Sequence, residues 1–214
     1  MRKRIVTARP ANTVSIVHGF LRALGRGALV ASLAFIGACA SVTVDDHARF
    51  TPTFSPEAFF DGSLRAHGVV KNRGGKIIRT FDATIDACWR DGAGYLVEDF
   101  IFDDGEEQRR IWTLAAQADG SYAATAGDVV GPGNLTVAGN SVFLDYVLTI
   151  PLGDGAIDVR VDDRMYLVAP DVLFNESVLS KFGVRVGSLG LVILRPEDAD
   201  HATARQRCLN TMTN

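Results

Sequence analysis

The chain has 214 residues, of which 47% are hydrophobic and 22% are charged, and its formal net charge is −3. This composition fits one folded domain and argues against a disordered chain or a many-pass membrane protein. Six of the 22 Lys and Arg residues lie within residues 1–38, which leaves 16 against 25 acidic residues and a net charge of about −9 for the rest. Because phosphate contacts need a surplus of Lys and Arg, this acidic body argues against nucleic acid as a partner.

The N-terminal segment, residues 1–38, has the order of an export signal. A basic stretch is followed by an apolar stretch over 28–36 and by two small residues before Cys39. The sequence Ile36-Gly37-Ala38-Cys39 resembles the lipobox of bacterial lipoproteins, which implies that Cys39 is lipidated and becomes the new N-terminus. An ordinary cleaved signal and a cytosolic thiol remain alternatives. A retained membrane anchor is another, because the 18 uncharged residues 27–44 just reach spanning length, about 17 to 25 residues.

Lipidation at Cys39 predicts a compartment. Several acyl chains, at about 0.8 kcal/mol per buried CH₂, would hold the protein on a membrane permanently. The next residue is Ala40 rather than Asp, and Asp there commonly keeps a Gram-negative lipoprotein at the inner membrane. We therefore expect an outer-membrane lipoprotein that faces the periplasm, with the membrane as its partner through the lipid anchor.

Export also changes what is expected of Cys88 and Cys208. In an oxidising compartment two thiols tend to form a disulfide, which could stabilise the fold by about 4 to 5 kcal/mol by closing a long loop. Two separate buried thiols are the alternative. The chain has three cysteines and no CxxC spacing, which argues against a redox or zinc site.

After the cysteine, the chain divides into three parts. Residues 39–57 lack a clear periodicity and are predicted to be a lipidated tether, whereas 58–195 alternate apolar stretches with Gly, Asp and Asn clusters that indicate strands and turns. Residues 196–214 predict a short C-terminal helix and tail, with Pro196 near the start. The predicted strands are Gly62–Val70, Lys76–Trp89, Gly94–Phe102, Glu107–Gln117, Ser121–Val130, Asn134–Gly139, Ser141–Pro151, Ala156–Val168 and Val184–Arg195.

Short turns between consecutive strands indicate an antiparallel meander of roughly eight to ten strands. A sheet of this length tends to close, because closure removes its exposed edges. The leading prediction is therefore an all-β, up-and-down, lipocalin-like barrel, and a β-sandwich is the alternative. A Cys88–Cys208 bond would attach the C-terminal helix to the barrel wall.

The turn Asp103-Asp104-Gly105 predicts a register. If Gly105 is left-handed in a three-residue loop, Glu98 lies opposite Arg110, and Leu96 lies opposite Trp112. Their face is otherwise apolar, so we expect it to point inward, with Glu98 and Arg110 as an ion pair. A two-residue turn would shift the register by one residue and separate the two charges.

Asp163 is a third charged residue predicted inside the barrel, because it alternates with Val161, Met165 and Leu167. Buried charges are costly unless they are paired. Two interpretations of the cluster stay open. The residues Glu98, Arg110, Trp112 and Asp163 form a structural plug, or they anchor the polar end of a ligand.

Several short runs of the chain, taken together, resemble a known family. The runs are Phe60-Asp61-Gly62, Glu98-Asp99-Phe100 with Asp104-Gly105, Arg110-Ile111-Trp112, Gly127-Asp128-Val129-Val130-Gly131, Asp163-Arg164-Met165-Tyr166 and Asn175 with Ser180-Lys181-Phe182-Gly183. They look like the bacterial lipoprotein family called domain of unknown function 3833, and the resemblance covers nearly all of residues 58–195. It implies an envelope location, one β-rich domain and no established activity.

The sequence offers no catalytic arrangement. The four histidines, His18, His47, His67 and His201, have no metal-ligand spacing, and no phosphate-binding loop is present. We therefore expect no enzyme, metal or cofactor. Two classes of function remain: a barrel that binds a fatty acid or another apolar small molecule, and a structural or assembly lipoprotein that acts through its outer surface around a packed interior.

Overall fold

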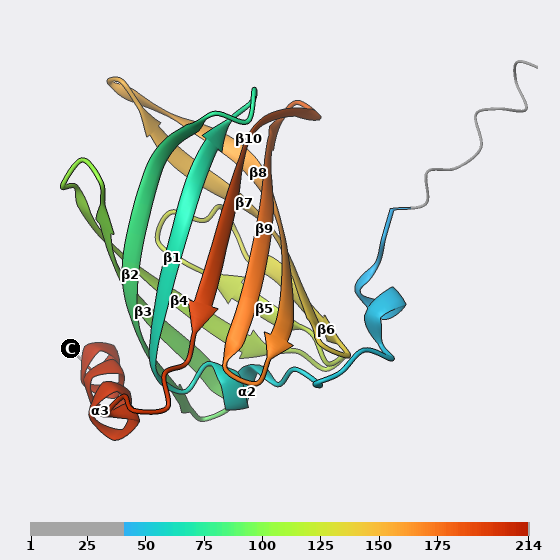
Figure 1. Cartoon of the computed structure of the whole chain (residues 1–214), viewed down its shortest axis with the longest axis vertical. Coiled ribbons are helices and arrows are strands. Elements are labelled where there is room, and N and C mark those ends of the chain that lie inside the picture. The colour runs from blue at the N-terminus through green and yellow to red at the C-terminus, as the bar shows by residue number, and fades with distance from the viewer. Residues whose placement is uncertain (1–40, 214) are drawn as a thin grey trace, which may run out of the picture. The chain divides into compact units, whose positions relative to one another are not determined.

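The computed structural model describes residues 41–213, and its main feature is a closed antiparallel barrel of ten strands (Figure 1). Each strand pairs with its neighbours in sequence, and β1 closes the barrel against β10. The predicted up-and-down barrel is confirmed, and the sandwich is not formed. The strands are β1 Gly62–Asn72, β2 Ile77–Arg90, β3 Ala93–Phe102, β4 Glu107–Ala116, β5 Tyr122–Thr125, β6 Gly133–Ala138, β7 Ser141–Leu152, β8 Gly155–Ala169, β9 Val172–Lys181 and β10 Val184–Leu194.

Side chains alternate between the interior and the outer wall along each strand, and the packed core fills one half of the interior. In β2 the odd-numbered residues from Phe81 to Ala87 are buried, whereas the even-numbered residues from Thr80 to Asp86 point outward. We call the end that holds the packed core the closed end, and the opposite end the mouth. The buried apolar residues that point inward in the closed half are Leu64, Ile85, Ala87, Leu96, Leu114, Ala124, Leu135, Val142, Met165, Leu167, Leu173 and Ile193.

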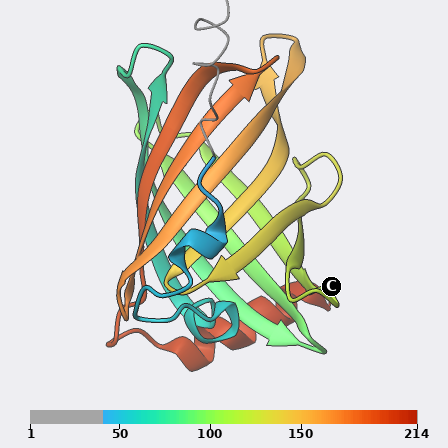
Figure 2. The ribbon, with the colours of Figure 1, turned by 90° about the vertical axis from the view of Figure 1, so that its right-hand side faces the viewer.

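The segment before β1 covers the closed end (Figure 2). It contains the 3₁₀ turn η1, Val44–His47, and the helix α2, Pro56–Phe59, and the rings of Phe54, Phe59 and Phe60 are buried against one another. Gly139 lets the backbone after η1 pass close to the barrel, because a Cβ at this position would clash with the carbonyl oxygen of His47. The structure thus differs from the predicted tether of residues 39–57: the compact unit begins at Thr43. Residues 1–38 and Cys39 lie outside the described residues.

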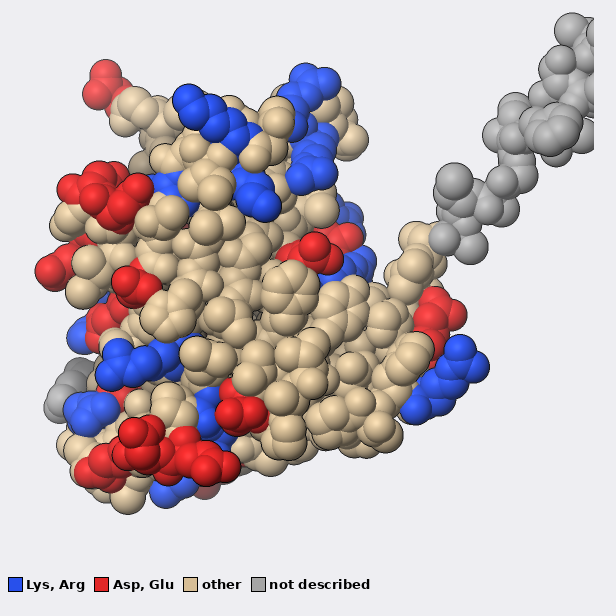
Figure 3. Space-filling view, viewed as in Figure 1, with Lys and Arg blue, Asp and Glu red and all other residues tan. Residues whose placement is uncertain are grey.

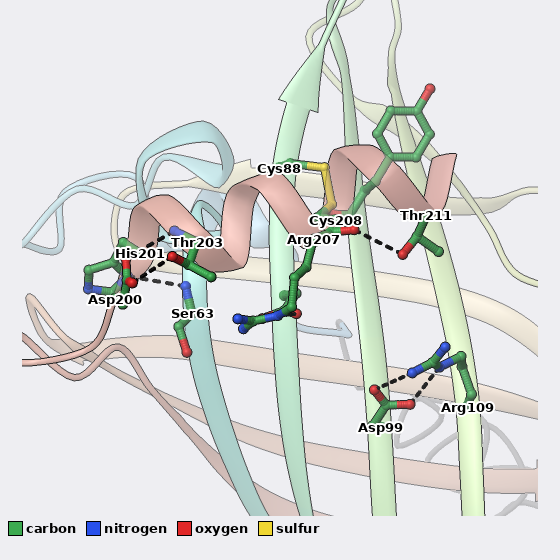
Figure 4. A network of polar contacts seen from close by, with 12 residues as sticks. Ser63, Cys88, Asp99, Arg109, Asp200, His201, Thr203, Arg207, Cys208 and Thr211 are labelled. Carbon is green, nitrogen blue, oxygen red and sulfur yellow. Dashed lines mark hydrogen bonds and ion pairs between the residues drawn. A yellow bond between two sulfur atoms is a disulfide. The ribbon is translucent and has the colours of Figure 1, made fainter. Parts of the chain in front are cut away.

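The C-terminal helix α3, His201–Met212, packs on the outer wall near the closed end, as Figure 4 shows. A disulfide joins Cys208 of α3 to Cys88 of β2, as predicted, and both residues are fully buried. Arg207 adds two hydrogen bonds to Asp86, of 2.6 and 2.7 Å. Within residues 41–213, no helix is both long and apolar enough to span a bilayer.

The structure contains one strand that was not predicted and one that is shorter than predicted, and both differences concern the interior. Strand β9 was not predicted, because Asn175 and Ser177 take two of its inward positions and break the apolar alternation. Strand β5 ends at Thr125 rather than at Val130, because residues 126–132 leave the sheet as a loop.

Candidate functional site

A group of polar side chains occupies the middle of the barrel interior. Glu98 comes from β3, Arg110 from β4 and Asp163 from β8, and the register points all three inward. We call the whole group the lumen cluster. Its members are Glu98, Arg110, Trp112, Asp128, Tyr146, Asp163, Asn175 and Ser177.

The predicted register of β3 and β4 is confirmed. Gly105 has a φ of +83°, the loop has three residues, and Glu98 lies opposite Arg110. The prediction that Arg110 forms its ion pair with Glu98 is wrong, however. The Arg110 guanidinium instead forms a two-pronged ion pair with Asp128, at 2.6 Å from Nη2 and 3.0 Å from Nε to Oδ2.

The loop of residues 126–132 positions Asp128. The backbone N–H of Val130 donates to the Val147 carbonyl, and the N–H of Thr149 donates to the Asp128 carbonyl, so β7 holds the loop at Asp128 and just after it. The side chains of Arg110 and Asp128 are 17% and 26% exposed. The register of β4 and β5 sets Thr113 opposite Thr125, and continued by three residues it sets Arg110 opposite Asp128. The loop therefore keeps the carboxylate near the position that a regular β5 strand would give it.

Asp163 is buried at 7% exposure, and its Oδ1 has no hydrogen-bond donor among the described residues. The same holds for Oδ1 of Asn175, which is 4% exposed and whose amide donates to Ser177 at 3.3 Å. Buried polar atoms are normally paired, because an unmade hydrogen bond costs about 1 to 3 kcal/mol. Two unpaired acceptors therefore lie next to each other on β8 and β9.

Burial controls the protonation of the two acids in the cluster. Burial raises the pKa of Glu98 to about 7. The positive charge of Arg110 opposes this shift, and the negative charge of Asp128 adds to it. Burial also raises the pKa of Asp163 to about 6, although hydrogen bonding from Ser177 and Tyr146 lowers it. Both carboxyls thus hold a proton more tightly in the folded barrel than in the unfolded chain.

These raised pKa values predict a pH dependence of stability. The folded state binds the extra protons, so the free energy of unfolding should fall by roughly 4 kcal/mol as pH rises from about 4.5 to 7. Glu98→Gln should reduce this decline in urea denaturation of the full chain. Glu107→Gln, on the outward face of β4, is the matched control and should keep it. An unchanged slope in Glu98→Gln would contradict the raised pKa.

Part of the apolar lining in the mouth half of the interior is only partly buried. Val70, Phe100, Leu148, Leu179 and Leu189 point inward by register, yet each keeps some exposed surface. In the closed half, the corresponding positions are fully buried. The lumen cluster thus lies between a packed apolar core and an apolar lining that solvent reaches.

The outer wall also carries grooves. One, of about 940 Å³, borders β9, β10, β1, β2 and β3, and most of its lining side chains point outward, including His67, Glu176 and Val192. It passes over Gly190, where no side chain fills the wall. A second groove of about 710 Å³ adjoins it at His67 and Asp82.

Of the residues predicted from the sequence, Glu98, Arg110, Trp112 and Asp163 come together in the cluster. The sequence did not identify the roles of Asp128, Tyr146, Asn175 and Ser177. Tyr146 was detectable, because it alternates with Leu144 and Leu148 along β7. Asp128 was detectable too, because it lies within the predicted strand 121–130 and the register of β4 and β5, continued, sets it opposite Arg110. Asn175 and Ser177 lie in a strand that the hydrophobic pattern does not reveal.

Comparisons with known proteins identify the family. No curated protein matches the chain. The barrel is similar to "S-type Phycobiliprotein Lyase CPES from Guillardia theta", at 13% identity and a TM-score of 0.45, over 74% of this chain and 100% of that one. It is also similar to a redesigned beta barrel, mFAP0, bound to DFHBI, at 12% identity and a TM-score of 0.36, over 64% and 99% of the two chains. It is similar to odorant binding protein OBP1 at 15% identity and a TM-score of 0.31, over 76% of this chain and 86% of that one.

These similarities describe the fold alone. The sequence match is more specific, because residues 33–195 match the family described as protein of unknown function DUF3833. That range includes every strand of the barrel and the lumen cluster. The chain therefore belongs to the DUF3833 family.

Proposed function

We propose that this protein is a non-catalytic binding protein whose barrel holds an apolar small molecule in the mouth half of its interior. We also propose that a lipid on Cys39 anchors it to the outer membrane, facing the periplasm. The lipobox resemblance supports the anchor, and the two-part interior supports the binding.

The observation that carries the binding proposal is the pair of unpaired acceptors on Asp163 and Asn175. A structural plug would satisfy its own polar atoms, because each one left unpaired lowers stability. Here the apolar lining lies on the mouth side of these atoms. An apolar lining with a few convergent polar groups is typical of small-molecule sites.

Filling the mouth half should abolish binding. Leu179→Trp adds a large inward side chain to β9, whereas Val178→Trp adds the same group to the outer wall, where Val178 is 41% exposed. We expect native mass spectrometry of the full chain, purified from the cell envelope, to show about one non-covalent apolar molecule per chain. Leu179→Trp should lose it and Val178→Trp should keep it. Ligand-free wild-type protein, or equal occupancy in the two variants, would contradict the proposal.

The anchor has a separate test. Mass spectrometry of the membrane-extracted protein should show an N-terminal peptide that begins at Cys39 and carries acyl chains. Cys39→Ser should abolish this modification. A peptide that retains residues 1–38, or a free thiol at Cys39, would contradict the lipid anchor.

The second candidate function is contact with a partner protein through the outer wall. The groove over Gly190 favours it, because its lining mixes apolar and charged side chains around a hollow. Gly190→Trp would fill this groove from outside. If this function holds, Gly190→Trp should abolish cross-linking to an envelope protein while the bound apolar molecule stays; cross-linking that persists would exclude it.

A further inference from the structure

We infer that the ligand of the barrel carries a hydrogen-bond donor at its polar end, a hydroxyl or an amine, and that an ionised carboxylate is rejected. This inference rests on the proposed function and names the chemical class of the ligand. It follows from the atoms that the lumen cluster leaves unpaired and from its charge.

Both unpaired atoms are acceptors. Oδ1 of Asp163 and Oδ1 of Asn175 accept hydrogen bonds, and the register sets Asp163 opposite Ser177, two residues from Asn175 on β9. A hydroxyl or amine at this point donates to one or both atoms. A carboxylate has only acceptors, so it would leave all of them unpaired and add repulsion.

The charge of the cluster leads to the same conclusion. Its acidic members are Glu98, Asp128 and Asp163, and its one basic member is Arg110. Arg110 already binds both oxygens of Asp128. A ligand carboxylate would thus enter a region with a surplus of negative charge and would compete with Asp128 for the guanidinium. The sequence analysis named a fatty acid as a possible ligand, and its ionised carboxylate is the head group that this cluster disfavours.

The lumen contains a reporter for the test. The chain has two tryptophans, and Trp112 is the one in the lumen cluster. In a Trp89→Phe background of the full chain in detergent, quenching of Trp112 by bromine-labelled sixteen-carbon chains with an alcohol, an amine or an acid head measures binding inside the barrel. At a pH above about 8, where the acid is ionised, the alcohol and the amine should bind about ten-fold tighter than the acid.

Asp163→Asn should reduce this preference by about ten-fold, because an amide can donate to a carboxylate. The matched control is Asp162→Asn on the outward face of β8, which should keep it. If none of the three chains quenches Trp112, the proposed function itself fails. If the acid binds as tightly as the alcohol, or if Asp162→Asn shifts the preference as Asp163→Asn does, the head-group inference fails while binding stands.

The outer surface of the mouth supports a second, independent inference. We propose that the mouth hairpins, defined as residues 71–78 and 181–186, dock on an anionic lipid surface. The hairpins lie next to each other, because β1 pairs with β10 up to Asn72 and Gly187. Figure 3 shows Lys and Arg side chains gathered at this end of the face.

The charge of the mouth hairpins fits a negative surface. They contain five basic residues and no acidic residue, and in residues 41–213 none of the five forms an ion pair. The side chain of Lys181 donates to the Asp158 carbonyl and leaves its positive charge uncompensated. The five are Lys71, Arg73, Lys76, Lys181 and Arg185.

Apolar side chains accompany these charges. Phe182 is 93% exposed at the tip of its hairpin, and its φ of +52° is rarely adopted by a bulky residue. Ile77 and Ile78 on the other hairpin are 50% and 59% exposed. Basic and aromatic side chains that share one exposed edge are typical of surfaces that insert shallowly into an anionic bilayer.

Depth-dependent quenching tests this docking. The full chain carrying Phe182→Trp is mixed with vesicles of phosphatidylglycerol and bromine-labelled phosphatidylcholine, and its fluorescence is compared with that of the unsubstituted chain. The control is Val168→Trp, which is 60% exposed near the closed end. Phe182→Trp should be quenched about two-fold more than Val168→Trp, and removing phosphatidylglycerol should abolish the difference. Equal quenching at both positions, or no effect of phosphatidylglycerol, would overturn the docking.

Discussion

Replacing Arg110 with methionine should lower the free energy of unfolding by about 3 kcal/mol. Methionine keeps much of the volume but removes the only positive charge of the lumen cluster. Asp128 then loses the three hydrogen bonds that Arg110 donates to it, and the field that opposes the raised pKa of Glu98 disappears. We expect the lower end of the range for buried pairs, because Asp128 keeps 26% of its side chain exposed.

The neighbouring residue supplies the control. Arg109 points outward and forms a two-pronged pair with Asp99, but the two side chains are 60% and 45% exposed. Arg109→Met should therefore cost at most about 1 kcal/mol. Urea denaturation of both variants at neutral pH measures the difference. Equal losses would mean that burial does not distinguish the two pairs.

Removing the disulfide should have the larger effect. The bond joins residues 120 apart in sequence, and the chain-entropy relation gives about 4 to 5 kcal/mol for a loop of that length. We expect Cys88→Ala with Cys208→Ala to lose this amount in denaturant unfolding. Reduction of the wild-type chain should give a similar loss, because both treatments release the same constraint on the unfolded state.

The helix itself offers a control for the disulfide. Arg207→Met removes the two hydrogen bonds to Asp86 but keeps the covalent link, and the Arg207 side chain is 56% exposed. Its loss should stay below about 1 kcal/mol. If the double alanine variant loses no more free energy of unfolding than Arg207→Met does, the disulfide does not restrict the unfolded chain.

Much of the barrel could be predicted because its signals are local. The alternation in β2 and β8 assigns each side chain to one face, and Gly105 fixes the loop length that places Glu98 opposite Arg110. The pairing of Cys88 with Cys208 was also predictable, because an oxidising compartment favours a disulfide and Cys39 had been assigned to lipidation. Strand β9 was missed for the opposite reason, since two inward polar residues hide its period of two.

The sequence alone determined the up-and-down strand order and, outside β9, the face of most residues and their neighbours across the hairpins. All three follow from a period of two residues and from turns a few residues long. The tertiary structure decided which groups meet across the interior. Arg110 has Glu98 on one side and Asp128 on the other, and only the structure shows that it pairs with Asp128. Trp112 of β4 meets Tyr146 of β7, with 5.2 Å between the ring centroids, because the closed barrel brings these two walls together around the lumen. Such contacts depend on the geometry of the closed barrel rather than on local pattern, so the full membership of the lumen cluster is visible only in the tertiary structure.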